Sequence, residues 1–235
     1  PVLVSTDAQG SWWGAIGGGT VSHSYILCFL KDTAEAMLHF ARILPPDIKR
    51  VALVDTNNDC IRDSLATAQR LFSKYVTLLD RGHHDEAQRY LLYGVRPDTA
   101  SNMLDRSTRD DYGVSANLVR RLRQALDEAY LTAPVSAKWR TAAKEYFHNI
   151  KIVASCGFDP EHIDRFEREG VPVDIYGVGS YLLRGESNDY TGDIVAAKIG
   201  DAWAELAKAG RRYIPSDRLQ KVELRHDDRG GRKAG

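Results

Sequence analysis

Four short polar segments, each placed directly after an apolar run, carry the residues of this chain that could do chemistry. They are DTNND from Asp55, RPDTASN from Arg96, SCGFDP from Ser155 and GVGS from Gly177. In parallel α/β folds, ligands bind at the carboxyl ends of the strands, where the connecting loops gather. We therefore expect these segments to share one site, in which the carboxylates of Asp55 and Asp98 and the guanidinium of Arg96 meet two turns of small residues.

This combination of groups suits a phosphorylated sugar. The segments SCGFDP and GVGS offer backbone N–H groups with little side chain to obstruct a phosphate, and the first of them also opens a helix. Carboxylates that face a phosphorylated ligand bind Mg²⁺ or ribose hydroxyls, and an arginine pairs with a carboxylate or stacks on a flat ring. A fifth segment, GGGTVSHS from Gly17, adds Thr20 and His23.

Each segment taken singly also has a purely structural explanation. A Gly-x-Gly pair is most often a turn, an aspartate at a strand end is often a helix cap, and a histidine beside glycines is often packed or solvated. Cys156 is either a reactive thiol or a small packed residue. The coincidence of five such segments at expected strand ends is what favours a site.

Short apolar runs alternate with amphipathic patterns along the chain, which predicts an α/β fold with parallel strands and right-handed crossovers. The expected strands are residues 2–4, 51–55, 91–95, 151–154 and 173–176. The expected helices are residues 33–43, 60–76, 115–131 and 160–169. Ser115 and Asp159 are the expected N-caps of the last two, with Pro160 at the first helical position. This alternation does not separate a barrel from an open doubly wound sheet.

The C-terminal part of the chain has a different pattern. Residues 190–219, YTGDIVAAKIGDAWAELAKAGRRYIPSDRL, predict a strand, a turn and then a polar strand or short helix. Residues 221–235 are polar and Gly-rich, so we expect a disordered tail. We therefore expect one folded portion over residues 1–220.

Composition excludes several classes of protein. Of 235 residues, 43 % are hydrophobic and 27 % are charged, which is typical of a globular protein with a sizeable core. Lys plus Arg equals Asp plus Glu at 32 each, which argues against a broad nucleic-acid or membrane face. No apolar run reaches the roughly 18–20 residues that span a bilayer. Three scattered cysteines form neither a disulfide framework nor a zinc motif. We expect a soluble, cytoplasmic protein.

Five blocks of the sequence resemble, in order, blocks of nicotinate phosphoribosyltransferases. They are STDAQGSWWGAIGGGTVSHSYI, VALVDT, YGVRPDT, VASCGFDPEHIDRFEREGVPVDIYGVGSYL and LAKAGRRYIPSDRL. The likeness covers most of residues 3–220, and the ordered set is specific although no single block is. The resemblance implies the type II phosphoribosyltransferase fold, an irregular α/β barrel with an N-terminal α/β domain. This chain matches the barrel portion and begins abruptly in an expected strand.

The resemblance also implies a reaction and its partners. The family joins nicotinate to 5-phosphoribosyl-1-pyrophosphate (PRPP), giving nicotinate mononucleotide and pyrophosphate in NAD salvage. Many members couple this reaction to ATP hydrolysis through a phosphorylated histidine. The family further implies Mg²⁺ and a homodimer or higher oligomer. We expect the N-terminal domain to be supplied by the same protein or by a partner chain.

Residue roles follow from the matching motifs. His23 corresponds to the histidine that ATP-coupled members phosphorylate, and Asp55 and Asp98 correspond to catalytic aspartates near the ribose and Mg²⁺. Arg96 would lie by the pyridine ring. The resemblance also implies substrate-binding roles for Thr20 and Thr99, and phosphate-binding roles for Ser155, Gly157, Gly177, Gly179 and Ser180.

The chain departs from the family's pattern at two places. Cys156 stands where a glycine is usual, and ASNM follows Thr99 where the better-known branch has SGD. Three alternatives therefore stay open. The chain could bind PRPP or a nucleotide as a regulatory module without catalysis, transfer phosphoribosyl to nicotinamide, or be another phosphosugar enzyme such as an isomerase.

Overall fold

The computed structural model describes residues 6–14, 17–18, 20–109, 111–183 and 196–205, together with Val4, Ile214 and Asp217. The chain divides into two units, Pro1–Gly185 and Glu186–Gly235, and each is described by itself. Residues 2 and 3 of the first expected strand lie outside the described residues, and Val4 is in no strand. The expected tail, residues 221–235, also lies outside them.

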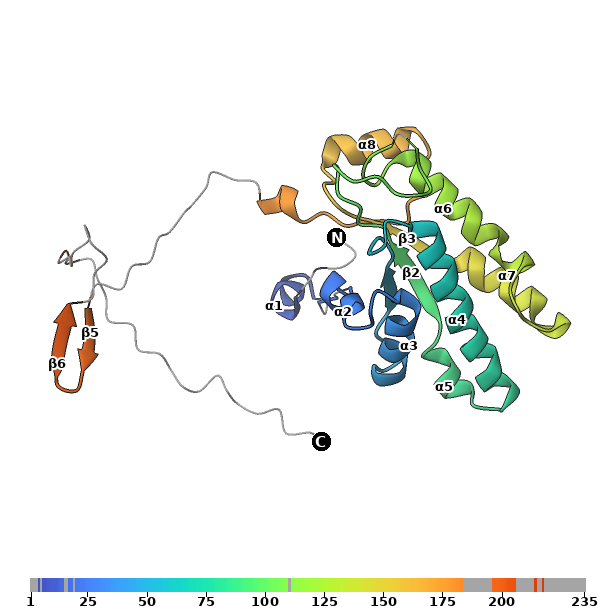
Figure 1. The fold of residues 1–235 in the computed structure, drawn as a ribbon, viewed down its shortest axis with the longest axis horizontal. Helices are drawn as coiled ribbons and strands as arrows, with labels where there is room; N and C mark the ends of the chain where they lie inside the picture. The colour runs from blue at the N-terminus through green and yellow to red at the C-terminus, as the bar shows by residue number, and fades with distance from the viewer. Residues whose placement is uncertain are drawn as a thin grey trace. The chain divides into compact units, whose positions relative to one another are not determined.

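Four parallel strands form the sheet of the first unit, in the order β1-β2-β3-β4 (Figure 1). They are β1 (Arg50–Leu53), β2 (Leu92–Arg96), β3 (Lys151–Ala154) and β4 (Ile175–Tyr176). Each lies within two residues of its expected position, so the predicted α/β fold with a parallel sheet is confirmed. Neighbours in sequence are neighbours in the sheet, as in the wall of an α/β barrel. Four strands neither show nor exclude a closed barrel.

Three helices, α1 to α3, precede β1, and the other α-helices of this unit lie in the connections between the strands. The α-helices are α1 (Asp7–Gly10), α2 (His23–Leu27), α3 (Thr33–Ile43), α4 (Cys60–Asp80), α5 (His84–Gln88), α6 (Ala116–Glu128), α7 (Arg140–Asn149) and α8 (Pro160–Arg168). The four helices expected from the sequence are α3, α4, α6 and α8, and α4 continues four residues beyond its expected end. In the described part of the chain, no helix is long and apolar enough to cross a membrane.

Side-chain caps fix where the helices begin. The carboxylate of Asp59 accepts from the N–H of Arg62 at the start of α4. Ser115 caps α6, as predicted, and Asp159 caps α8 by accepting from the N–H of His162 at 2.8 Å. The loops that follow β1, β2 and β3 are therefore held at both ends, by the strand that precedes them and by a capped helix.

One apolar core joins the sheet to the helices. In Figure 1, α4, α6 and α7 lie together on one side of the strands, and these helices contact one another. The strands and helices contribute residues with no solvent exposure to this core: Ala52, Leu53, Val95, Ile152, Leu71, Leu118, Leu122 and Phe147. Burial of the strands explains why their sequences are continuously apolar.

In the second unit, a hairpin is described. Its strands are β5 (Ala196–Ile199) and β6 (Ala202–Glu205), which pair antiparallel across Gly200 and Asp201. Gly200 has a φ of 62°, a value that suits the first central position of a two-residue hairpin turn. Of the two predictions for this segment, the polar strand is confirmed over the short helix. Residues 190–195 and 206–213 lie outside the described residues.

Arg50, the first residue of β1, is only 2 % exposed and closes the C-terminal end of α3. Its Nη2 donates to the carbonyl of Leu44 at 2.7 Å, and its Nη1 donates to the carbonyl of Pro45 at 2.7 Å. Nη1 also donates to the carbonyl of Ile48. The last carbonyls of a helix have no partner within the helix, and Nη2 also donates to one of these, the carbonyl of Ala41 in α3, at 3.5 Å.

Arg50→Leu should lower the free energy of unfolding by about 2–4 kcal/mol, because several partly buried carbonyls lose their donor. Urea unfolding followed by circular dichroism measures this loss. The control is Arg70→Leu, which removes an exposed guanidinium paired with Asp32 and Glu35; exposed pairs contribute about 1 kcal/mol or less. Equal losses in the two variants would show that the buried guanidinium has no special role.

Candidate active site

The loops that follow β1, β2 and β3 meet at the carboxyl ends of these strands. The N–H of Val54 donates to the carbonyl of Arg96 at 3.2 Å, and the N–H of Ser155 donates to the carbonyl of Pro97 at 3.2 Å. Strand pairing thus continues past each strand end and sets the loops side by side. The structure brings together the four predicted polar segments, because the segment that begins at Gly177 also contacts the end of β3, through the N–H of Gly177 and the carbonyl of Ala154.

Arg96, Asp98 and Ser155 form a closed triangle of contacts. Nη1 of Arg96 lies 3.2 Å from Oδ2 of Asp98 and donates to Oγ of Ser155 at 3.1 Å. The hydroxyl of Ser155 lies 2.6 Å from Oδ1 of Asp98. The side chains of Arg96 and Asp98 are 15 % and 25 % exposed, so the pair is largely removed from water yet open on one side. Each group holds the other two in place.

His23 and Asp55 form a second pair beside this triangle. Nε2 of His23 lies 3.0 and 3.1 Å from the two carboxylate oxygens of Asp55. His23 is the first residue of α2, and the hydroxyl of Ser22 caps this helix. Burial raises the pKa of Asp55, and the negative charge of Asp98 raises it further. The charge and the hydrogen bond of His23 lower this pKa. An ionised carboxylate only accepts hydrogen bonds, so with Asp55 ionised, Nε2 of His23 is the donor in this contact.

A hydrogen bond to the backbone joins the triangle of Arg96, Asp98 and Ser155 to the segment that carries His23. Nη2 of Arg96 donates to the carbonyl of Val21 at 3.2 Å, two residues before His23. The guanidinium therefore contacts the segment before α2, the loop after β2 and the loop after β3 at once. The structure places His23, Asp55, Arg96, Asp98 and Ser155 in one connected group, which we call the carboxylate cluster.

Cys156 directly follows this cluster in an unusual backbone conformation. Its φ is 77°, in the left-handed region that favours glycine, and the next residue, Gly157, also has a φ of 77°. Burial raises the pKa of the Cys156 thiol, and the charges of Asp98 and Asp55 raise it further. A thiol with a raised pKa stays protonated at neutral pH. Cys156 is exposed, so it is not the small packed residue of one sequence-based explanation, and its raised pKa disfavours the reactive thiolate of the other.

The residues expected to hold a phosphate are only partly free to do so. The N–H of Ser155 already donates to the carbonyl of Pro97, and the N–H of Gly177 donates to the carbonyl of Ala154 at 2.8 Å. A Cβ at Gly177 would lie 2.9 Å from Cβ of Ser155, so a side chain has no room there. Gly157 and Gly179 border open space, and Ser180, exposed, begins a short 3₁₀ helix over Ser180–Leu183. Phosphate binding by these turns stays a prediction.

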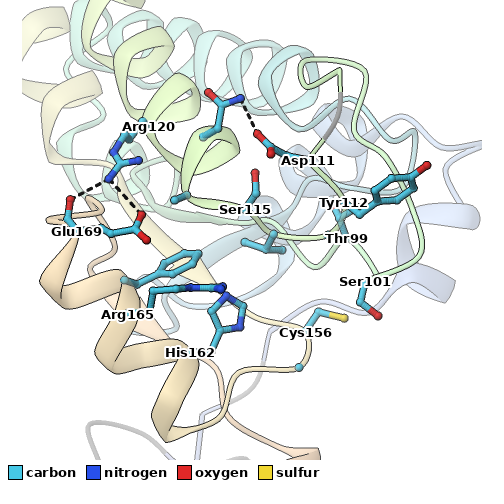
Figure 2. A pocket seen from close by; sticks show the side chains of 16 residues that line it. Thr99, Ser101, Asp111, Tyr112, Ser115, Arg120, Cys156, His162, Arg165 and Glu169 are labelled. Carbon is cyan, nitrogen blue, oxygen red and sulfur yellow. Dashed lines mark hydrogen bonds and ion pairs between the residues drawn. The ribbon is translucent and has the colours of Figure 1, made fainter.

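The two threonines lie outside the hydrogen bonds of the carboxylate cluster. Thr99 is buried, and its Oγ1 lies 3.7 Å from Sγ of Cys60. Thr20 is exposed. Thr99 also lines a neighbouring cavity of about 410 Å³, shown in Figure 2, which extends between α6 and α8. A substrate-binding role for either threonine stays a prediction.

The donor set can be compared with the needs of Mg²⁺. Within the described ranges, no group of three or more His, Cys, Asp and Glu side chains is arranged to hold a metal ion. Mg²⁺, however, usually binds proteins through one or two carboxylates and takes its other ligands from water and substrate phosphates. Asp55 and Asp98, at neighbouring strand ends, fit that mode of binding.

Asp105 contributes to the site in a way that the sequence did not reveal. It is fully buried, and its Oδ2 accepts from the N–H of Cys60, the first residue of α4, at 2.8 Å. Its Oδ1 accepts from the N–H and the hydroxyl of Ser107. This carboxylate ties the loop after β2 to the start of α4, and hence to the loop that carries Asp55. An aspartate in a polar stretch signals a turn but gives no sign of burial.

Asp105→Ala should destabilise the protein by about 1–3 kcal/mol at neutral pH, because buried N–H groups lose a charged acceptor. Burial alone would raise the pKa of Asp105, but hydrogen bonds from Ser107 and Cys60 outweigh burial and lower it. The folded-state pKa then lies below the unfolded value of about 3.9. The stabilisation is complete above the unfolded value and is lost as pH falls through the folded-state pKa.

Urea unfolding from pH 7 to pH 2.5 measures this difference between wild type and variant. Asp164→Ala is the control, because Asp164 is exposed on α8 and pairs with Arg168 within the helix. A difference between wild type and Asp105→Ala that does not shrink toward low pH would contradict the proposed hydrogen bonding.

Comparisons with known proteins give limited information about this chain. No family model and no curated protein matches the chain. A solved structure with a likeness to it is the crystal structure of nicotinate-nucleotide pyrophosphorylase from Pyrococcus furiosus, with 24 % sequence identity and a TM-score of 0.48. The match covers 89 % of this chain and 41 % of that one, so the chain spans about two fifths of that protein's length. A likeness at this level does not define a function.

Proposed function

We propose that this chain is the barrel portion of a nicotinate phosphoribosyltransferase, which transfers the phosphoribosyl group of PRPP to nicotinate and releases pyrophosphate. The observation that supports this proposal is the carboxylate cluster, which gathers a histidine, two carboxylates, an arginine and a serine at the carboxyl ends of adjacent parallel strands. These are residues that the family-like blocks single out. His23 lies within hydrogen-bonding distance of Asp55, and Arg96, Asp98 and Ser155 lie within hydrogen-bonding distance of one another.

The cluster suits a reaction that develops positive charge on a sugar. In the proposed reaction, the bond between C1 and the pyrophosphate oxygen breaks while the pyridine nitrogen forms a bond to C1. Negative groups fixed near C1 stabilise the oxocarbenium-like state. Asp98 is held by Ser155 and Arg96, so its carboxylate needs little rearrangement when the charge develops.

Arg96 is suited to orient the base. Its guanidinium is tied at Nη1 to Asp98 and Ser155 and at Nη2 to the carbonyl of Val21. These bonds lie in the guanidinium plane and leave its faces for stacking on a flat pyridine ring. In this proposal, Arg96 contacts the base and Asp98 contacts the ribose, so two residues of one strand end serve the two halves of the substrate complex.

A metal ion and further protein parts complete the proposal. Asp55 and Asp98 would hold Mg²⁺ together with the PRPP pyrophosphate, where the ion would neutralise charge on the leaving group. The enzyme would act as a homo-oligomer, with an N-terminal domain supplied by the same protein or by a partner chain.

His23 is placed for coupling to ATP. Its Nε2 is bound to Asp55, which leaves Nδ1 as the nucleophile for a phosphoryl group. In the proposed coupling, Nδ1 attacks the γ-phosphorus of ATP, the bond to ADP breaks, and phosphohistidine forms. Asp55 would stabilise the positive charge that the ring acquires in this step.

A second candidate function is a PRPP-binding regulatory module without catalysis. Two observations favour it over a working enzyme. The N–H groups of Ser155 and Gly177 are used within the sheet, and Cys156 occupies a strained position in the turn expected to bind phosphate. The first observation reduces the number of backbone donors available to a phosphate, and the second reduces the space.

The full-length protein should form nicotinate mononucleotide and pyrophosphate from nicotinate and PRPP with Mg²⁺, as measured by chromatography. Asp98→Asn should lower kcat by about 10²-fold or more, because the transition state loses a fixed negative charge. Asp164→Asn, an exposed change on α8, should leave kcat unaltered. Turnover of nicotinamide or quinolinate, but not of nicotinate, would show that nicotinate is not the substrate. PRPP binding without turnover in the complete assembly would favour the regulatory module.

His23→Ala should abolish the ATP hydrolysis that accompanies transfer, while transfer without ATP continues at a reduced rate. Phosphohistidine detected by ³¹P NMR should be present in the wild type and absent from this variant. His84→Ala changes an exposed histidine on α5 and should keep both signals. Unaltered coupling in His23→Ala would remove the role assigned to this residue.

A further inference from the structure

A cavity of about 410 Å³ lies beside the carboxylate cluster (Figure 2). Its volume is within the range of about 300–1,000 Å³ that is typical of small-molecule sites. The loop after β2 and the start of α6 form one wall, and the loop after β3 and α8 form the other. Thr99, Cys156 and Gly157 line it, whereas His23, Asp55, Arg96 and Asp98 are not among its described lining residues. The cavity therefore adjoins the cluster without containing it.

The wall formed by the loop after β2 is built before any ligand arrives. Gly113 has a φ of 70°, its N–H donates to the carbonyl of Met103 at 2.9 Å, and a Cβ there would lie 3.2 Å from Cα of Ser101. A β-bridge joins Leu104 to Tyr112. These contacts fold the loop back on itself, so the cavity is preorganised.

Arg165 supplies a positive charge to this cavity with no carboxylate partner among the described residues. The residue one turn further along, Glu169, is engaged by Arg120 from α6, which lies 3.6 Å from its carboxylate and donates to its carbonyl at 2.8 Å. Figure 2 shows these bonds, with Arg165 beside His162 on the α8 side of the cavity. The guanidinium of Arg165 lies 5.9 Å from the ring centroid of Phe166.

His162 adds a hydrogen-bonding group without a second positive charge. Burial lowers its pKa, and the charge of Arg165 lowers it further, so the imidazole is neutral at pH 7. Its ring stacks on Phe158 with centroids 4.4 Å apart, which fixes its position. Ser115, on the other wall, uses its oxygen to cap α6 and keeps its O–H to donate.

The charges of the lining limit the kind of ligand. Arg120 and Arg165 carry two positive charges, Asp111 and Glu169 carry two negative ones, and the formal sum is zero with His162 neutral. A polyanion is therefore disfavoured. Asp111 accepts from the side-chain amide of Asn117 at 2.8 Å and forms no ion pair with the described residues, which leaves it able to accept from ligand hydroxyls. A ligand with one phosphate and several hydroxyls offers an anion to Arg165 and hydrogen-bond donors to Asp111.

We propose that this cavity is a second binding site, distinct from the carboxylate cluster, for a small sugar monophosphate. Its phosphate binds Arg165, and its hydroxyls face Ser115 and Asp111. The site shares Thr99 and Gly157 with the residues to which the resemblance assigns substrate and phosphate binding, but Arg165, its phosphate contact, is not one of them. Because Thr99 and Cys156 line the cavity and also belong to the loops of the cluster, a ligand here touches the segments that position Asp98 and Ser155.

Calorimetric titration with ribose 5-phosphate tests this site in the full-length protein. Arg165→Gln should weaken binding about tenfold or more, because it removes a charge-assisted hydrogen bond. The matched control is Arg168→Gln, on the same helix but paired with Asp164 outside the cavity, and it should bind as the wild type does. Equal affinity in wild type and Arg165→Gln, or no binding to the wild type at millimolar ligand, would overturn the proposal.

The location of the ligand separates this proposal from the proposed function. Amide NMR shifts on adding ribose 5-phosphate should change at residues 115–120 and 162–169. Binding that is lost in Asp98→Asn but kept in Arg165→Gln would place the ligand in the carboxylate cluster and overturn the second site. Formation of nicotinate mononucleotide is measured independently, so failure of one proposal leaves the other to its own assay.

Discussion

The contact triangle of Arg96, Asp98 and Ser155 is the constraint around which the candidate site is arranged. An ion pair that is largely withdrawn from water is costly when either partner is missing, because the remaining charge is left without compensation. Here the hydroxyl of Ser155 bonds to both partners, and Pro97 restricts the backbone between them. The ends of β2 and β3 are therefore locked to each other by polar contacts as well as by the sheet.

The other polar contacts extend this lock to the neighbouring loops. Arg96 reaches back to the carbonyl of Val21 and so sets the start of α2, which presents His23 to Asp55. Asp105 works from the opposite side, where it joins the loop after β2 to the first turn of α4. Both arrangements use a charged side chain to satisfy backbone groups of another segment, which fixes these loops in addition to the apolar core, to which Val21 and Cys60 belong.

Periodicity and caps predicted much of the fold, because buried strands and long amphipathic helices carry patterns that local sequence can show. The same reasoning placed Asp55, Arg96, Asp98 and Ser155 near one another, since parallel strands end at one edge. Short helices such as α2 and α5 have only five residues, too few for a periodic signal. The burial of Asp105 and Thr99, and the engagement of Glu169 by Arg120, depend on contacts between distant segments, which no local pattern records.

Ser155 lies 57 residues after Asp98 in the chain, and this separation bears on the order in which the protein folds. Within the described residues, each strand of the four-stranded sheet pairs with its neighbours in sequence, so the sheet can grow in the order of synthesis. Until β3 docks, the charges at the end of β2 remain in water without their serine. The geometry of the candidate site therefore forms only after β3 is made, and a nascent chain that stops before β3 has the carboxylates but no assembled site.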